Sequence, residues 1–204
     1  KPTPDAPIQL YAADFDKNGS LDPVMTWYQG GKEYPLPQRD VMIKQMPVLK
    51  KDFVYHRAYG QTTIKDLFNA SALEAAQKLV AKSFATTVFI NNQGKFTAQP
   101  LPVTVQFSAC NQIVSNDFDG DGNLDLLLVG NSYLTEVESG RYDASNGTVL
   151  LGNGKGAFTE SQNRFNGFWA NKEARDMAAI KLANGKTMYL IANNNDFMQA
   201  YVGK

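Results

Sequence analysis

The sequence predicts a mainly β fold built from repeated hairpins, with one helical segment between strands. Three observations support this prediction: short apolar runs between turn residues, Asn/Gly turns typical of hairpins, and helical spacing of apolar residues confined to one stretch. The 204 residues include 20 Lys and Arg and 20 Asp and Glu, so the net charge is zero. That balance argues against a nucleic-acid partner. The longest aliphatic run, residues 126–129, is far shorter than the roughly 20 residues of a membrane-spanning helix.

Two nine-residue segments, 14–22 and 117–125, share one template. Each has oxygen-bearing side chains at positions 1, 3, 5 and 9, Gly at position 6, Phe at position 2 and Leu at position 8. Position 7 can add its backbone carbonyl. The candidate metal ligands are Asp14, Asp16, Asn18, Ser20 and Asp22 in the first loop and Asp117, Asp119, Asp121, Asn123 and Asp125 in the second.

Calcium is the cation that best suits this pattern. It takes six to eight oxygen ligands, whereas magnesium needs a smaller octahedral shell and keeps more water. Without a cation, so many carboxylates in a tight loop would repel one another. We therefore expect two structural calcium sites, with the second tighter because it has four carboxylates and the first has three. The alternative is an ordinary Asp/Asn/Gly turn without metal. Phe and Leu at positions 2 and 8 are expected to point into the core.

The flanking residues distinguish these loops from EF-hands. An EF-hand carries an acidic ligand at position 12 and lies between helices, but position 12 here is Met25 or Leu128. The missing acid also argues against a dockerin. The residues around the second loop read as strands, so both loops are expected at the ends of β-hairpins, with Asp22 and Asp125 completing the ligand shell.

The loops start 103 residues apart, and each is followed by a predicted hairpin, over 87–97 and 148–159. A third unit, 168–202, keeps the strands but replaces the loop with 177–186, which lacks the acids, so no metal is expected there. Repeated four-stranded units are typical of β-propellers. The prediction is a single partial propeller over 1–204, of about three blades, which forms the C-terminal portion of a larger propeller. Its open edges are candidates for pairing in a dimer.

The two loops resemble those of FG-GAP and VCBS repeats, found in integrin α-subunit propellers and bacterial relatives. Further likeness to the bacterial cartilage-acidic-protein-like group lies in residues 131–133 (Asn-Ser-Tyr), 140–145 (Gly-Arg-Tyr-Asp-Ala-Ser) and 151–156 (Leu-Gly-Asn-Gly-Lys-Gly). The resemblance implies that calcium holds the blade loops. It also implies an exported protein, periplasmic or at the cell surface.

Residues 32–84 do not fit a blade and are expected to form a partly helical insertion. An apolar stripe predicts one or two helices over 66–84, with Ser71 or Asn69 as cap. The stripe comprises Leu67, Phe68, Leu73, Ala76, Leu79 and Val80. Long insertions on a rigid scaffold often carry function.

Five residues outside the loops are candidate ligand-binding residues: Tyr55, His56, Arg57, Tyr59 and Arg141. The first four could stack on a sugar or bind an anion, or could pin the insertion to the sheets. Arg141 could bind a ligand or form a local ion pair with Asp143. With one Cys and one His in the chain, a zinc site or a serine-type triad is improbable.

The predicted function is therefore a non-enzymatic, calcium-stabilised binding module with a carbohydrate or protein ligand. The alternative is part of a propeller-type polysaccharide lyase or hydrolase. For that alternative the chain offers no convincing acid, base and nucleophile outside the loops. RNA binding, a third idea, is disfavoured by the zero net charge.

Overall fold

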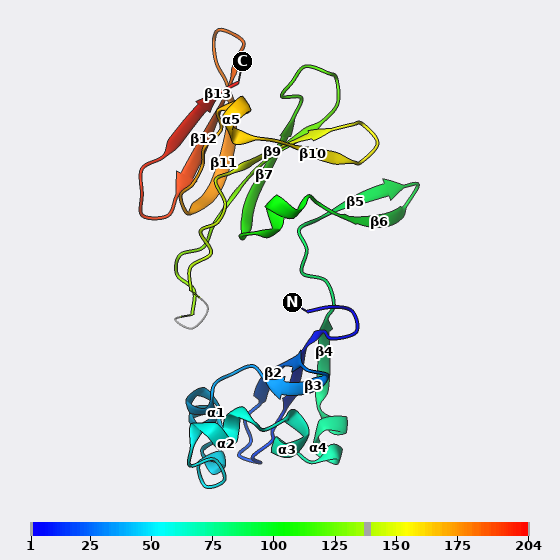
Figure 1. Cartoon of the computed structure of the whole chain (residues 1–204), viewed down its shortest axis with the longest axis vertical. Coiled ribbons are helices and arrows are strands. Elements are labelled where there is room, and N and C mark those ends of the chain that lie inside the picture. The colour runs from blue at the N-terminus through cyan, green and yellow to red at the C-terminus, as the bar shows by residue number, and fades with distance from the viewer. Residues whose placement is uncertain (1, 137–139, 204) are drawn as a thin grey trace. The chain divides into compact units, whose positions relative to one another are not determined.

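The computed structural model describes residues 2–136 and 140–203. The chain divides into two compact units, Lys1–Phe84 and Ala85–Lys204, and each is described by itself (Figure 1). Strands make up 39% of the chain against 17% for helices, and they form four antiparallel sheets. The prediction of a mainly β fold is confirmed.

The first unit contains one four-stranded sheet, in the order β3-β2-β1-β4. Its strands are β1 (Ile8–Ala13), β2 (Asp22–Gln29), β3 (Lys32–Pro35) and β4 (Gln77–Ala81). Between β3 and β4 the chain forms α1 (Arg39–Gln45), the 3₁₀ helix η1 (Pro47–Lys50), α2 (His56–Gly60), α3 (Ile64–Leu67) and α4 (Ala70–Ala75). The first acidic loop connects β1 to β2, so its predicted place at a hairpin end is confirmed.

Segment 32–84, expected as an insertion, in fact supplies both outer strands of this sheet. The helix expected over 66–84 is wrong in its second half. Asn69 caps α4 by accepting a hydrogen bond from Ala72 N at 2.8 Å, but the helix ends at Ala75 and Leu79 pairs with Leu10 of β1. Apolar spacing alone cannot separate a short helix from a short strand, and pairing with β1 decides the outcome.

The core of the first unit lies between one face of the sheet and the short helices. Tyr11 and Val24 are buried from the sheet side, and Met42, Ile64 and Phe68 are buried from the helical side. Along β2, buried side chains such as Val24 alternate with exposed ones, as expected for a sheet with one covered face. The helices therefore act as the cover of the sheet.

The second unit contains three sheets. A hairpin of β5 (Thr87–Asn92) and β6 (Lys95–Pro100) is followed by the 3₁₀ helix η2 (Val103–Gln106). The central sheet has the order β10-β9-β8-β7 and comprises β7 (Cys110–Asn116), β8 (Asp125–Gly130), β9 (Thr148–Gly152) and β10 (Phe158–Ser161). After α5 (Asn163–Asn166), the third sheet contains β11 (Ala174–Lys181), β12 (Thr187–Asn193) and β13 (Gln199–Val202).

The hairpins predicted at 87–97 and 148–159 are both present. The first of them does not join the sheet of the first acidic loop, as the repeat suggested, but forms a separate two-stranded sheet of the second unit. Strands were also expected in 168–202, and β11 to β13 confirm them.

The central sheet of the second unit is covered on both faces. Leu127, Val129 and Val149 pack against Met177 and Ile191 of the third sheet. The alternate residues Leu128 and Leu150 pack on the other face, against Leu101, Val105 and Val88. Such continuous apolar strands result when both faces of a sheet are buried. The third sheet thus covers one face of β8 and the segment around η2 covers the other, and β8 carries the second acidic loop at its start.

Candidate metal centres

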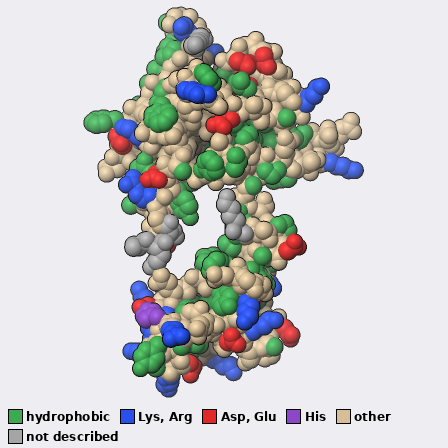
Figure 2. All heavy atoms as spheres, viewed as in Figure 1, with side chains coloured by type: hydrophobic (Ala, Val, Ile, Leu, Met, Phe, Trp, Pro, Cys, Tyr) green, Lys and Arg blue, Asp and Glu red, His purple; other side chains and the backbone are tan. Residues whose placement is uncertain are grey.

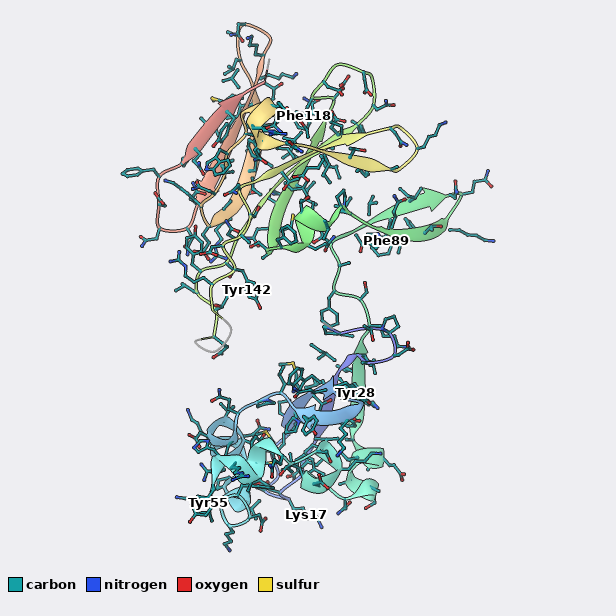
Figure 3. All side chains as sticks on the ribbon, viewed as in Figure 1. Lys17, Tyr28, Tyr55, Phe89, Phe118 and Tyr142 are labelled. Carbon is teal, nitrogen blue, oxygen red and sulfur yellow. The ribbon has the colours of Figure 1, made fainter. Side chains whose placement is uncertain are left out.

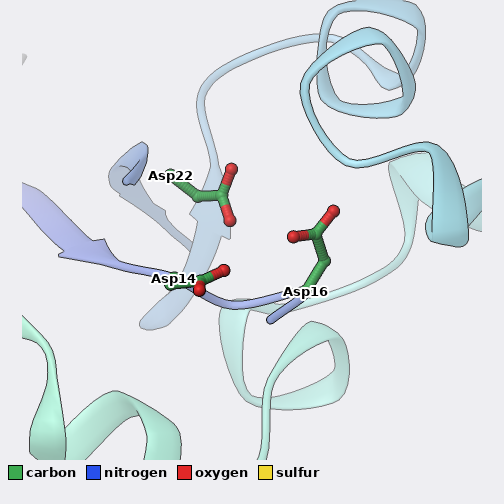
Figure 4. Close-up of side chains that lie close together, drawn as sticks. All are labelled: Asp14, Asp16 and Asp22. Atoms are coloured by element: carbon green, nitrogen blue, oxygen red, sulfur yellow. The ribbon is translucent and has the colours of Figure 1, made fainter. Parts of the chain in front are cut away.

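The first acidic loop brings three carboxylates together. One oxygen each from Asp14, Asp16 and Asp22 lies within 4.8 Å of the other two (Figure 4). Asp14 accepts hydrogen bonds from Asn18 N at 3.0 Å and Gly19 N at 2.8 Å, which fixes the loop around that side chain. Asp22 is only 2% exposed. It is the first residue of β2, so the sheet holds this carboxylate beneath the loop.

The second loop forms an equivalent cluster from Asp117, Asp119 and Asp121, whose oxygens also lie within 4.8 Å of one another. Asp117 accepts hydrogen bonds from Gly120 N at 2.7 Å and Gly122 N at 2.9 Å. Each loop thus brings three carboxylates together. Position 5 supplies the third carboxylate of the second loop, and position 9 supplies that of the first.

Asp125, expected to complete the ligand shell, also ties the loop to the sheet. Its side chain is fully buried, and its two oxygens accept hydrogen bonds from Phe118 N at 2.8 Å and Gly152 N at 2.7 Å. Gly152 belongs to β9, so Asp125 ties the loop to the neighbouring strand. Its counterpart Asp22 accepts the equivalent bond from Phe15 N at 3.0 Å.

The remaining ligand candidates shape the turns. Asn18 Oδ1 accepts a hydrogen bond from Ser20 N at 2.7 Å. Asn123 donates from both its backbone nitrogen and its side-chain Nδ2 to Asp121, at 2.8 Å each. These bonds lower the pKa of Asp121, the backbone donor being the larger cause, so this carboxylate stays ionised to lower pH than an ordinary aspartate.

The backbone conformations of the two loops match. Positions 4 and 6 have positive φ in both: 60° and 87° at Lys17 and Gly19, and 84° and 86° at Gly120 and Gly122. Glycine adopts such angles freely, whereas an L-residue with a Cβ atom is strained there. Lys17 is therefore the strained member of this set.

The electrostatics of both clusters fit a divalent cation. Within residues 2–136 and 140–203, the ion pairs use Asp40, Asp196 and Glu173, and none reaches a loop acid. Three carboxylates within 4.8 Å repel one another unless a cation compensates them. The donors are all hard oxygens, the ligands that calcium prefers.

Only one of the two apolar positions anchors each loop. At position 2, Phe15 stacks on Phe68 with ring centroids 3.9 Å apart, and Phe118 packs on Tyr189 at 5.4 Å. Figure 3 shows Phe118 among the packed side chains of the second unit. At position 8 the expectation is wrong, because Leu21 and Leu124 are 67% and 66% exposed. Position 8 precedes the strand, where the tight turn directs the side chain outward.

Of the four candidates around α2, the structure brings His56 and Tyr59 together at one hollow, which Tyr55 and Arg57 do not line. Tyr59 is buried, its hydroxyl donates to Pro37 O at 2.8 Å, and burial raises its pKa. Tyr55, His56 and Arg57 are exposed, and Tyr55 is labelled at the edge of the first unit in Figure 3. His56 Nε2 lies 3.8 Å from Asp40 Oδ1. Tyr59 therefore pins the helical segment to the 35–38 connection.

Arg141 contacts an aromatic ring and not Asp143. Its guanidinium carbon lies 3.9 Å from the centre of the Tyr133 ring, a cation–π contact. Tyr133 N in turn donates to the buried carboxylate of Glu173 at 3.0 Å. Glu173 also accepts from Asn194 Nδ2 at 2.9 Å and pairs with Arg175 at 2.6 Å. Arg141 thus belongs to a structural network.

Sequence reasoning missed the most buried polar group of this region. Asn131 is fully buried with φ of 78°. Its Nδ2 donates to Ser145 O at 2.8 Å and to Lys172 O at 3.1 Å, while its Oδ1 accepts from Ser108 Oγ at 2.8 Å. The available signal was an Asn directly after an apolar strand, a residue type that tolerates positive φ, but the partners of Asn131 are distant in sequence.

A cavity of about 600 Å³ adjoins the second acidic loop, between the central and third sheets. Its walls include Asp117 and Asp119 together with Phe118, Phe168, Tyr189 and Tyr201. Both tyrosine hydroxyls already have partners: Tyr189 OH accepts from Asn116 Nδ2, and Tyr201 OH donates to Trp169 O. The Asn116–Tyr189 bond links the central sheet to the third sheet, so both tyrosine hydroxyls of this cavity have structural roles.

Comparison with known proteins adds no assignment. Searches with protein-family models, among curated proteins and among solved structures found no match to this chain. Over the described residues, none of the helices combines the length and the apolar character needed to cross a lipid bilayer. The two acidic clusters are therefore the features from which a function can be argued.

Proposed function

We propose that this chain is a calcium-stabilised, non-enzymatic binding module of an exported protein, periplasmic or at the cell surface, with a glycan or protein ligand. The observation that carries the proposal is the pair of matching acidic loops, each with three carboxylates converging within 4.8 Å at a hairpin end. A calcium ion in each loop would compensate these charges and lock the hairpin. Loops of this kind suit compartments where calcium is abundant, as in extracellular modules.

A partial β-propeller of the FG-GAP/VCBS type is the architecture we propose for the module. Its support is the packing of two antiparallel sheets in the second unit, where the third sheet covers one face of the central sheet. Successive propeller blades pack face to face in this manner. In the first unit, the acidic loop between β1 and β2 matches the acidic loop between β7 and β8 of the second unit. This match supports the proposal that the two units contain copies of one repeat.

The enzyme alternative has no supporting observation. Arg141 contacts the ring of Tyr133, and Tyr59 is buried with its hydroxyl engaged. A hydrolase or lyase needs acid and base groups converging on one position. Among the described residues, the converging carboxylates are those of the two loops.

Calcium dependence of stability tests the proposal. Thermal unfolding of the full chain is measured with calcium, with magnesium and with excess EGTA. A ligand at 100 times its Kd adds about 2.7 kcal/mol per site, so calcium is expected to raise the Tm by several degrees and magnesium much less. Calorimetric titration should give two equivalents.

Variants assign the equivalents to the loops. Asp16→Asn and Asp119→Asn should each remove one equivalent, while Asp52→Asn, an exposed acid outside the loops, should remove none. An unchanged Tm in EGTA, or loss of calcium binding in Asp52→Asn alone, would contradict the proposal.

A further inference from the structure

A second hollow, of about 380 Å³, lies in the first unit, where the ends of β2 and β3 meet the 35–38 connection and α2. Trp27, Gln29, Tyr34, Gln38, Arg39 and His56 are among the residues that line it. We call it the Trp27 groove. The single histidine, purple in Figure 2, lies at the surface of this unit. None of the metal ligands lines the groove.

One wall of the groove is aromatic and open to solvent. Trp27 pairs across the strands with Tyr34, so both rings stand on the same face of the sheet, and Trp27 is 40% exposed. β3 is an edge strand, so no further strand covers this side. An exposed indole next to a second ring offers a flat apolar platform, the surface on which a sugar ring stacks.

The opposite wall is held rigid. Tyr59 is buried and its hydroxyl donates to Pro37 O at 2.8 Å, and Pro35 is buried beside Tyr34. Two prolines restrict the backbone of the connection further. A preformed site loses little conformational entropy when a ligand binds.

Two amide side chains at the groove are free to bind a ligand. Gln29 and Gln38 are exposed, and neither side chain has a hydrogen-bond partner within residues 2–136 and 140–203. An amide both donates and accepts, as does a sugar hydroxyl. Together with the imidazole of His56, they supply polar groups around the aromatic platform.

The charges at the groove favour an uncharged ligand. Arg39 is already committed: its Nε donates to Phe53 O at 2.6 Å, Nη1 to Asp40 at 2.6 Å and Nη2 to Val54 O at 3.1 Å. It is therefore not available as a bidentate anion binder. Asp40, which lies 3.8 Å from His56, is compensated by the same Arg39, so the pair adds no net charge that would attract an acidic ligand.

We propose that the Trp27 groove binds a neutral carbohydrate, with a pyranose ring stacked on Trp27 and its hydroxyls hydrogen-bonded to Gln29, Gln38 and His56. This inference rests on the proposed binding-module function and names its ligand class and site. It is independent of the acidic loops, since their residues are not part of the groove.

The two tryptophans of the chain make a direct test possible. Trp169, in the second unit, is removed as Trp169→Phe, which leaves Trp27 as the only indole reporter. The calcium-loaded full chain is screened on an array of neutral and acidic oligosaccharides. The best neutral oligosaccharide is then titrated by fluorescence and calorimetry. Binding with a change in Trp27 emission is the expected result.

Matched variants locate the binding. Trp27→Ala should weaken binding at least tenfold, and Gln38→Ala, at an exposed position, should weaken it about threefold without changing the Tm. Arg57→Ala, an exposed residue beside His56 that does not line the groove, is the control. Calcium binding is measured on the same samples.

Several results would overturn the inference. The inference fails if no neutral oligosaccharide binds at millimolar concentration, or if acidic glycans bind more tightly than neutral ones. It also fails if a proline-rich probe peptide binds in place of sugar, or if Trp27→Ala and Gln38→Ala both leave glycan binding unchanged. If two calcium equivalents are still bound in such a case, only the groove assignment fails. If calcium binding is also absent, the proposed function fails with it.

Discussion

The Asn131 side chain holds three separate segments of the second unit together, and replacing it by aspartate tests how much that network stabilises the fold. The substitution keeps the size and shape of the side chain. Oδ1 can still accept from Ser108 Oγ and Ser145 N, at 2.8 and 3.0 Å. What is lost is the Nδ2 donor, which serves Ser145 O at 2.8 Å and Lys172 O at 3.1 Å.

The expected cost follows from these contacts. Ser145 O loses its partner, whereas Lys172 O keeps the hydrogen bond from Ala174 N at 2.9 Å. One orphaned group at a fully buried side chain costs about 1–3 kcal/mol, and the burial of a carboxylate adds to this cost. At roughly 4 °C per kcal/mol for a unit of this size, the Tm of the second unit should fall by at least about 4 °C.

Differential scanning calorimetry of Asn131→Asp in calcium measures this drop. Asn184→Asp is the control, because Asn184 is exposed and only accepts, from Lys186 N at 3.0 Å. Its Tm should stay within about 1 °C of the parent chain, as for most surface substitutions. If both variants melt within 2 °C of each other, the Asn131 network contributes little and the reasoning is refuted.

Three further predictions concern the loops and the buried acid. Asn18→Asp should tighten calcium binding at the first loop and Asp121→Asn should weaken it at the second, each by about tenfold, because the number of charged ligands sets affinity. If calorimetry shows the calcium Kd moving in the same direction for both variants, this reasoning is contradicted. Lys17 has a φ of 60°, where a side chain is strained. Lys17→Gly should therefore raise the free energy of unfolding in EGTA by up to about 1 kcal/mol. A lower free energy of unfolding in a urea titration would show that Lys17 is not strained. Hydrogen bonds from Asn194 and Tyr133 lower the pKa of Glu173. The contribution of Glu173 to the free energy of unfolding is therefore complete above about pH 4.3, the pKa of unfolded glutamate, and is lost as the pH falls through the lower folded pKa. Glu173→Gln should flatten this loss of stability at acid pH in EGTA, and an unchanged pH dependence would show that Glu173 does not contribute to it.

Local patterns predicted the loops well because their geometry is local. In each loop, the side chains at positions 1 and 3 and the glycine at position 6 act within nine residues, and both copies fold alike. Position 9 shows what such patterns leave out. Asp22 joins its cluster, and Asp125 also accepts a hydrogen bond from Gly152 N of a neighbouring strand, which no spacing rule can foresee.

The misassigned helix has a similar cause. Leu73 and Ala76 fit the helical spacing, and so do Leu79 and Val80, but the last two lie in β4, opposite Leu10 and Gln9. The free edge of β1 offers backbone partners to all of 77–81, and this ladder forms in place of a longer helix. The choice depended on β1, which is about seventy residues away in the sequence.

By itself the sequence determined the mainly β class, the two hairpin-end loops and the residues whose carboxylates converge there, because strand propensity and tight-turn chemistry operate over a few residues. Only the tertiary structure decided which strands share a sheet, where Asn131 and Glu173 find their partners, and how Trp27, Gln38 and His56 come to line one groove. Those outcomes depend on contacts between distant segments, whose free energy is gained only when the segments pack.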